Sequence, residues 1–227
     1  MATLLLRLAA PLQSWGTESK FDTRNTGREP SKSGIVGLLA AALGYRRHET
    51  DKLAELSSLR LGIRVDREGR LLRDYHTAHS EKNVPYVTNR YYLADAVFIV
   101  GIEGERDRLE EIAYALSHPA FPLFLGRRSC PPTLPLFLGI RDAVLDDALK
   151  AEKIWVSKEP RSVRYIFDAA PGKRGAAVRD VPLSFDPKLR AYGYRGVTEK
   201  FVSGKEEPEH DPFDELEDDY VSFTDKT

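Results

Sequence analysis

The order of apolar patterns along the first 126 residues limits the possible folds of this chain more than any other feature. An apolar run at residues 2–10, ATLLLRLAA, ends at Pro11 and has no capping residue before it, which favours a buried strand over a helix. Apolar residues then recur at helical spacing from residue 35 to residue 43, and Gly44 is placed to end that helix. The chain is therefore expected to begin with a strand followed by a helix.

The next stretch repeats this pattern with one extra strand. A helical piece at residues 50–58 leads into residues 59–66, whose alternating apolar side chains predict a half-buried strand, and another apolar strand is expected at residues 94–104. An amphipathic helix should follow and end at His118, before a last strand around FPLFLG, residues 121–126. This β-α-β-β-α-β order predicts an α+β fold of the ferredoxin-like class.

Residues 71–93, LLRDYHTAHSEKNVPYVTNRYYL, are polar and aromatic and lack a sustained period. A structureless loop of this length is unusual inside a compact domain, so we expect a long hairpin that projects from the sheet. Its tyrosines are interleaved with Lys82, Asn89 and Arg90. Such a surface could bind single-stranded RNA by base stacking beside cations, or the tyrosines could pack the back of the hairpin, and the sequence does not separate the two.

The rest of the chain is expected to be rich in short strands. The pentapeptide PLFLG occurs twice and brackets RRSCPP, and past residue 140 the segments IWV, RYIFDAA, VPLSF and AYGYRGVTEKFV alternate with Gly and Pro. We divide the chain into a ferredoxin-like domain at residues 1–140, with a projecting hairpin at about 74–92, a small β-rich addition at 141–205 and an acidic tail at 206–227.

The charge of the chain is unevenly distributed. Its formal net charge is −1, but the last 22 residues contain ten acids and one Lys, so the 205 residues before them contain 33 Lys and Arg against 25 Asp and Glu. A basic body of this size is compatible with a polyanionic partner, and equally with a merely soluble surface. We expect the acidic tail to be a disordered, solubilising segment, with folding back onto the basic face as the alternative.

Composition excludes several classes of protein. A single cysteine, Cys130, rules out an internal disulfide and any multi-cysteine metal site, and it fits a reducing compartment. No apolar run approaches the roughly 18 residues that cross a bilayer, and the first 16 residues have too short an apolar core for a secretory signal. The sequence therefore predicts a cytoplasmic protein with no membrane partner.

The loop TRNTGREPSKSG, residues 23–34, precedes the first helix and is rich in glycine, hydroxyls and cations. Backbone N–H groups and the positive end of the helix dipole at such a place favour an anion, and Arg24, Arg28 and Lys32 would add charge. The glycine spacing and the lack of a Gly-Lys-Ser/Thr triplet exclude a nucleotide P-loop. An N-cap by Ser31 or Ser33 would explain the hydroxyls but leave the cations without a role.

The segment GRRSC, residues 126–130, places two arginines after an expected strand. Neighbouring residues of a strand point to opposite faces, so one of Arg127 and Arg128 could reach a ligand while the other pairs with the fold. Cys130 beside arginine could be a nucleophile with a lowered pKa, but no motif connects it to a base, and a packed thiol is the favoured interpretation.

Tyr75, His76 and His79 in YHTAH suggest general acid-base chemistry, which is sufficient for RNA cleavage. A structural or surface role for His76 is the competing interpretation and the favoured one. Two histidines three residues apart on an extended segment do not share a face, so a metal site is not predicted. No cofactor is expected.

Five segments together resemble a known family. They are LRLAAPLQSWG, TRNTGREPSKSGIVGLLAAALG, RDYHTA, YYLADAVF and LGRRSCPPTLPLFLG, within residues 4–139. In this order they are similar to the Cas-five family of the RAMP superfamily, and within it to the CasD subunits of the type I-E CRISPR surveillance complex Cascade. The resemblance covers about three fifths of the chain.

The resemblance implies an RRM-like ferredoxin fold with a projecting thumb and a non-catalytic role. Such subunits bind the 5′ handle of the CRISPR RNA, cap the CasC backbone and contact the large CasA subunit, and they reach target DNA only through the complex. Together with the residue-level reasoning, this makes the candidate RNA-binding residues Arg24, Thr26, Gly27, Arg28, Lys32, Ser33, Gly34, Tyr75, His76, Arg127, Arg128, Ser129 and Cys130.

Two other functions compete with this one. A related branch of the family cuts precursor CRISPR RNA itself, which would make the chain a metal-independent endoribonuclease using His76 with Tyr75 or a nearby Lys. The type I-E-like motifs argue against this, because a separate CasE endonuclease performs that step in such systems. A pure protein-protein adaptor is the third possibility.

Overall fold

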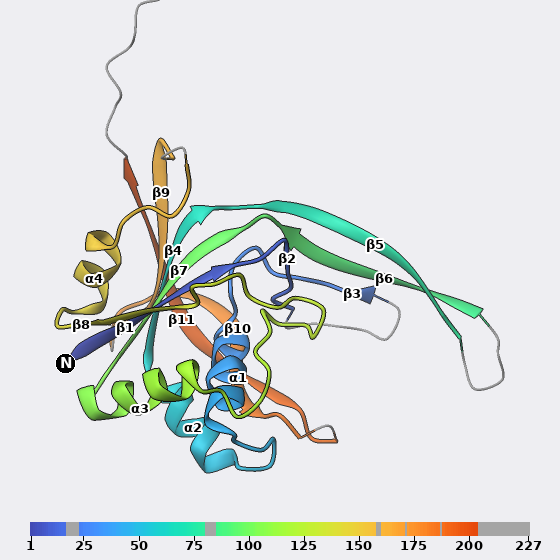
Figure 1. The fold of residues 1–227 in the computed structure, drawn as a ribbon, viewed down its shortest axis with the longest axis horizontal. Coiled ribbons are helices and arrows are strands. Elements are labelled where there is room, and N and C mark those ends of the chain that lie inside the picture. The colour runs from blue at the N-terminus through green and yellow to red at the C-terminus, as the bar shows by residue number, and fades with distance from the viewer. Residues whose placement is uncertain (17–22, 80–84, 158–159, 171, 187, 204–227) are drawn as a thin grey trace, which may run out of the picture.

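The computed structural model describes residues 1–16, 23–79, 85–157, 160–170, 172–186 and 188–203. In these residues the chain forms four helices and two sheets whose strands pair mainly antiparallel, which confirms the predicted α+β class (Figure 1). The acidic tail predicted at residues 206–227 lies outside the described residues. No described helix has the length and hydropathy needed to cross a membrane.

A seven-stranded sheet forms the body of the protein, in the order β10-β11-β9-β4-β7-β1-β8. The first strand, β1, lies between β7 and β8, and β4 lies on the other side of β7. All of these neighbours pair antiparallel. The four strands are β1 (Ala2–Ala9), β4 (Arg60–Arg67), β7 (Val97–Gly104) and β8 (Phe137–Arg141).

Three of the helices follow the sequence prediction. Helix α1 ends at Gly44, whose φ of 76° is a conformation that glycine adopts freely. Helix α4 was not predicted, and the strand expected at IWV, residues 154–156, is wrong, because this segment is irregular. The helices are α1 (Lys32–Leu43), α2 (Thr50–Ser58), α3 (Arg106–Ser117) and α4 (Leu145–Ala151).

Strand β1 is apolar throughout because both of its faces are buried. Leu4, Leu6 and Leu8 contribute to the core that includes residues of α1, α2 and α3. Leu5 points the opposite way and packs with Leu145 and Leu149 of α4. The uninterrupted run of leucines therefore reflects a strand covered by helices on both sides, as Figure 1 also shows.

The last strand of the predicted ferredoxin-like order is in a different place from the prediction. FPLFLG, residues 121–126, forms a loop, and the second copy of PLFLG leads into β8 instead. The first copy contains Leu125, whose N–H donates to the carbonyl of Cys130, so the chain turns there and cannot pair with β1. The sequence alone could not show which of the two identical pentapeptides contributes the strand beside β1.

The expected projecting hairpin is present, and we call it the arm. It consists of β5 (Arg70–His79) and β6 (Pro85–Ala94), which pair antiparallel over ten residues each and extend away from the body (Figure 1). Two short strands also pair with β6, namely β2 (Leu12–Gln13) at the base of the arm and β3 (Thr23–Arg24) near the middle of β6.

The strands after residue 160 continue the main sheet. β9 (Ser162–Asp168) pairs with β4, β11 (Ala191–Ser203) pairs with β9, and β10 (Ala176–Ser184) forms the edge. Strands β9, β10 and β11 thus share one sheet with β1, β4, β7 and β8.

Four charges that are buried or mostly buried connect these late strands to the start of α1. The Lys32 ammonium lies 2.8 Å from an Asp168 carboxylate oxygen. Arg195 on β11 binds Asp180 on β10 through two nitrogens, at 2.7 and 2.8 Å, and also contacts Asp168. The Lys32 N–H in the first turn of α1 donates to Asp180 at 2.8 Å. Each charge has an opposite partner, as burial requires.

Removing one member of this network should destabilise the fold strongly. Asp180→Asn leaves the Arg195 guanidinium buried with less compensation, and we expect the free energy of unfolding to fall by roughly 3 kcal/mol. Asp142→Asn is the control, because Asp142 pairs with Arg106 on the surface, where a pair contributes about 1 kcal/mol or less. Urea denaturation of both variants measures the difference, and equal losses would contradict the role of the network.

The same network predicts how stability depends on pH. Burial by itself would raise the pKa of Asp168, but Lys32 and Arg195 outweigh it and the pKa is lowered. A lowered pKa in the folded state stabilises the protein fully above about pH 4, the pKa of an unfolded aspartate, and this contribution is lost as pH falls further. In urea titrations from about pH 6 to about pH 3, Asp168→Asn should therefore lose less stability than the native chain.

Candidate nucleic-acid interface

Trp15 contacts the loop at residues 23–30 and helps to fix its conformation. Its ring is buried, with the indole N–H donating to the Gln13 side chain at 3.1 Å. The Trp15 backbone N–H donates to the Thr26 hydroxyl at 2.8 Å, and the Gly27 N–H donates to the Trp15 carbonyl at 3.1 Å. Thr26 and Gly27 thus determine the shape of the loop. The sequence motif LQSWG contained Trp15, but nothing in it signalled this role.

Gly34 allows the ring of Trp15 to lie against the first turn of α1. A Cβ atom at position 34 would come within 2.8 and 2.9 Å of two Trp15 ring carbons, closer than real Cβ contacts allow. The lack of a side chain at Gly34 therefore lets the first turn of α1 approach an aromatic ring of the protein itself.

The start of α1 does not present the free anion site that the sequence suggested. Ser31 is the N-cap, and its hydroxyl accepts from the Gly34 N–H at 3.2 Å and lies 3.3 Å from the Ser33 hydroxyl. The Asp180 carboxylate already accepts the Lys32 N–H. The Lys32 ammonium pairs with Asp168, so it does not add its charge to the loop surface as expected.

GRRSC forms a tight turn and not the end of a strand. Gly126 has φ of 88°, and a Cβ there would lie 1.6 Å from the Ser14 carbonyl oxygen, so only glycine fits. The Ser14 N–H donates to the Leu125 carbonyl, and the Cys130 N–H donates to the Arg127 carbonyl. Arg127 and Arg128 therefore belong to a turn. The expectation that they point to opposite faces of a strand is wrong.

Arg127 joins three segments that are distant in sequence. Its Nη2 donates to the carbonyl of Arg24 at 2.7 Å and of Asn25 at 3.3 Å. Its guanidinium lies 4.7 Å from the ring centroid of Tyr92, a buried residue of the arm. Arg127 thus fixes the loop, the 126–130 turn and the base of the arm relative to one another. The sequence did not distinguish Tyr92 from the other tyrosines of the arm.

Three arginines around this frame are exposed to solvent: Arg24, Arg28 and Arg128. None of them is within ion-pair distance of a carboxylate in the described residues. Ser129 is also exposed, and its hydroxyl lies 3.5 Å from that of Tyr92. Uncompensated guanidiniums on a rigid frame are suited to oxygen-rich anions such as phosphates.

Cys130 is 1% exposed and lies inside the turn. Burial raises the pKa of its thiol, although Ser129 and Arg127 act in the opposite direction. The reactive thiolate is therefore disfavoured, in agreement with a packed thiol.

The arm places Tyr75 and His76 on opposite faces. Both side chains are exposed, with Tyr75 opposite Asn89 and His76 opposite Thr88 in the antiparallel ladder. Adjacent residues of a paired strand point apart, so the two cannot flank one phosphate as an acid and a base. This overturns the combination of His76 with Tyr75 in the endoribonuclease hypothesis. His79, the other histidine of the YHTAH segment, is also exposed.

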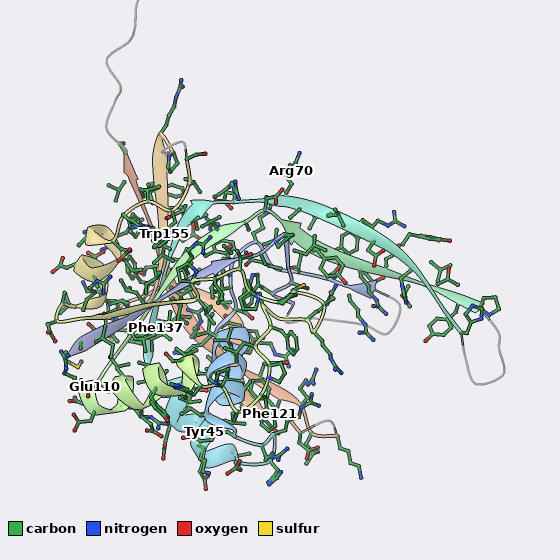
Figure 2. All side chains as sticks on the ribbon, viewed as in Figure 1. Tyr45, Arg70, Glu110, Phe121, Phe137 and Trp155 are labelled. Atoms are coloured by element: carbon green, nitrogen blue, oxygen red, sulfur yellow. The ribbon has the colours of Figure 1, made fainter. Side chains whose placement is uncertain are left out.

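An open groove of about 930 Å³ runs along α1, next to the loop and the 126–130 turn. Its floor includes small residues of α1, and Figure 2 shows the labelled Tyr45 and Phe121 beside the same helix. No Asp or Glu is among the described residues that line it. Its arginines are Arg24, Arg46, Arg47, Arg127 and Arg190.

Comparison with known proteins connects this architecture to one family. Residues 3–198 match the family model described as "CRISPR-associated protein (Cas_Cas5)". The chain belongs to the Cas5 family. The matched region includes the loop, the arm, the 126–130 turn and most of β11.

Individual relatives agree with this assignment. The chain is 40% identical over 156 residues to the CRISPR system Cascade subunit CasD of Escherichia coli (strain K12), covering 60% of this chain and 70% of that protein. A solved structure described as "Crystal structure of Cas protein" superimposes with a TM-score of 0.73 at 42% identity, covering 88% of this chain and 95% of the other. A chain of a "CRISPR RNA-guided surveillance complex" gives 0.73 at 34% identity, with coverage of 88% and 90%.

Two glycines of α1 provide a matched test of the Trp15 contact. Gly34→Ala should push the Trp15 ring out of place and lower the free energy of unfolding by about 1 to 3 kcal/mol. Gly37→Ala should be neutral or stabilise by up to about 1 kcal/mol, because its Cβ would meet only a Phe185 ring atom at 3.8 Å and alanine favours helix. Urea unfolding measures both, and a Gly34→Ala variant as stable as Gly37→Ala would contradict the packing argument.

Proposed function

We propose that this chain is the CasD-like subunit of a Cascade-type CRISPR surveillance complex, where it binds the 5′ handle of the CRISPR RNA without cleaving it. The observation that carries the proposal is the set of exposed arginines Arg24, Arg28 and Arg128, which lack carboxylate partners in the described residues. The Cas5 family membership and the relative named as a Cascade subunit support it.

In this proposal the side chains have two different roles. Arg24, Arg28, Arg128 and the Ser129 hydroxyl contact RNA phosphates or sugars, which single-stranded RNA exposes along its whole length. Thr26, Gly27, Gly34 and Arg127 position the loop and the turn that present them. Lys32, Ser33 and Cys130 are buried and belong to the fold.

The rest of the fold supplies surfaces for the complex. The strand order β8-β1-β7-β4 with α1 and α3 is a ferredoxin-like, RRM-like core, and the arm is the thumb of the family. Exposed Tyr75, His76 and Tyr86 on the arm are available to stack on bases or to contact a neighbouring subunit. The protein partners are the CasC backbone and the large CasA subunit, and target DNA is reached only through the assembled complex.

Loss of the three arginines tests the RNA site. The triple variant Arg24→Ala, Arg28→Ala, Arg128→Ala should bind handle RNA about tenfold more weakly or worse, because three charge-assisted contacts are lost. The slope of log K against log salt should also fall by about 2, since each phosphate contact on a single strand contributes about 0.7. Fluorescence anisotropy with labelled repeat RNA at several salt concentrations measures both quantities.

A control variant with Lys52, Arg106 and Lys150 changed to Ala removes the same charge elsewhere, at exposed residues whose carboxylate partners are exposed or partly exposed. It should leave the salt slope nearly unchanged. Equal effects of the two triple variants would show that net charge alone acts, and the assignment of the loop and the turn would be abandoned.

A further inference from the structure

The groove along α1 extends beyond the proposed RNA site. At the start of α1 it is lined by Arg24 and Arg127, which also belong to that site. Toward the other end of the helix it is lined by Arg46 and Arg47, which follow the Gly44 cap, and by Arg190 from the β10–β11 connection. The distal half of the groove therefore has its own cluster of cations, to which the proposed function assigns no role.

This distal half combines an apolar floor with unsatisfied positive charge. Gly37, Leu38 and Ala41 of α1 line it together with aromatic residues from three other segments. Arg46 lies over the ring of Phe121 at 4.9 Å, and neither Arg47 nor Arg190 has an ion-pair partner in the part of the chain that the structure describes. Such a surface is complementary to a segment in which apolar side chains alternate with carboxylates.

The chain itself contains such a segment. Residues 206–227 have ten acids and one Lys. Among these acids the large apolar side chains recur at intervals of three or four residues: Phe213, Leu216, Tyr220 and Phe223. No other stretch of the sequence has this composition.

The length of this segment is sufficient to reach the groove. β11 starts at Ala191, next to the groove residues Arg190 and Tyr192, and ends at Ser203 after 13 residues, roughly 40 Å away. The 24 residues after Ser203 can span up to roughly 80 Å when extended. From about residue 214 onward they can therefore return along the full length of β11.

We propose that residues 206–227 dock in the α1 groove and compete with RNA for Arg24, so that the free subunit is autoinhibited. A tether of this length gives an effective concentration near the millimolar range, which favours the tail over an acidic segment of another protein. The docking itself needs only the groove and the tail, whereas its effect on RNA rests on the proposed function. RNA that binds at Arg24 displaces the tail.

The first experiment detects docking without RNA. A labelled peptide of residues 206–227 is titrated, at low salt, into a full-length chain in which five of the ten tail acids are neutralised by Asp214→Asn, Glu215→Gln, Glu217→Gln, Asp218→Asn and Asp219→Asn; we call it the tail-neutralised chain. Fluorescence anisotropy should show saturable binding that weakens with salt and is lost when Arg46, Arg47 and Arg190 are changed to Ala. No binding, or binding that survives these three changes, overturns the proposal.

A matched peptide separates docking from general attraction between opposite charges. It keeps every acid but carries Phe213→Ser, Leu216→Ser, Tyr220→Ser and Phe223→Ser. This peptide should bind at least about tenfold more weakly, because burying even one such apolar side chain strengthens binding by about that factor. Equal binding of the two peptides contradicts docking in the groove.

The second experiment measures whether changes in the distal groove strengthen or weaken RNA binding. In the native chain, changing Arg46, Arg47 and Arg190 to Ala should tighten RNA binding at low salt, by about tenfold where the tail occupies about nine tenths of the molecules. In the tail-neutralised chain the same changes should have no effect. Weaker RNA binding in both backgrounds would show that RNA itself occupies the distal groove, and unchanged binding in both would show that the tail does not compete; either result overturns the proposal.

These outcomes are separable from those of the proposed function. If no variant binds handle RNA, the proposed function fails, while the peptide titration still decides whether the tail docks. If the triple variant of Arg24, Arg28 and Arg128 loses RNA binding but the peptide does not bind, the RNA site stands and autoinhibition fails.

Discussion

The buried pairing of Lys32 and Arg195 with Asp168 and Asp180 is the interaction on which the rest of the molecule depends. It connects the first turn of α1 to three strands that are more than 130 residues later in the sequence. In the described residues, the contacts of Lys32 with Asp168 and Asp180 are the polar contacts between these late strands and α1, the helix beside the proposed RNA site. Four charges in a buried place are costly unless their geometry is correct, so the network selects one arrangement of α1 on the sheet more than it adds net stability.

A second constraint is steric, and it acts where the loop at residues 23–30 and the 126–130 turn meet α1. Trp15 lies between the loop and α1, and the close contacts of Gly34 and Gly126 leave no room for a side chain at either position. Arg127 then joins the loop to the turn and the arm through backbone carbonyls and the ring of Tyr92. Because these contacts are made by the protein alone, the exposed arginines are positioned before any ligand arrives, which lowers the entropy cost of binding.

Much of the fold could be predicted because its elements have local signals. The leucine run of β1, the helical period of α1 and the Gly44 cap are readable from a few neighbouring residues. What failed depends on distant contacts: the choice between the two PLFLG copies, the unpredicted helix α4 and the turn at GRRSC. For the candidate site, the sequence indicated a loop rich in cations, of which Arg24 and Arg28 are exposed, but it could not show that Lys32 turns inward, because its partner Asp168 is far along the chain.

The position of Asp180 changes the expected chemistry of recognition. A free helix N-terminus would bind a phosphate through its backbone N–H groups, which are the same in every helix. Here a protein carboxylate accepts the Lys32 N–H, so in the proposed function an RNA phosphate would be bound by the exposed guanidiniums of the neighbouring loop and turn. A negative Asp180 behind the loop would also repel an anion that approached α1 directly, although Lys32 and Arg195 neutralise much of that charge. Binding should therefore depend on the three exposed arginines and on salt, and hardly at all on the helix dipole.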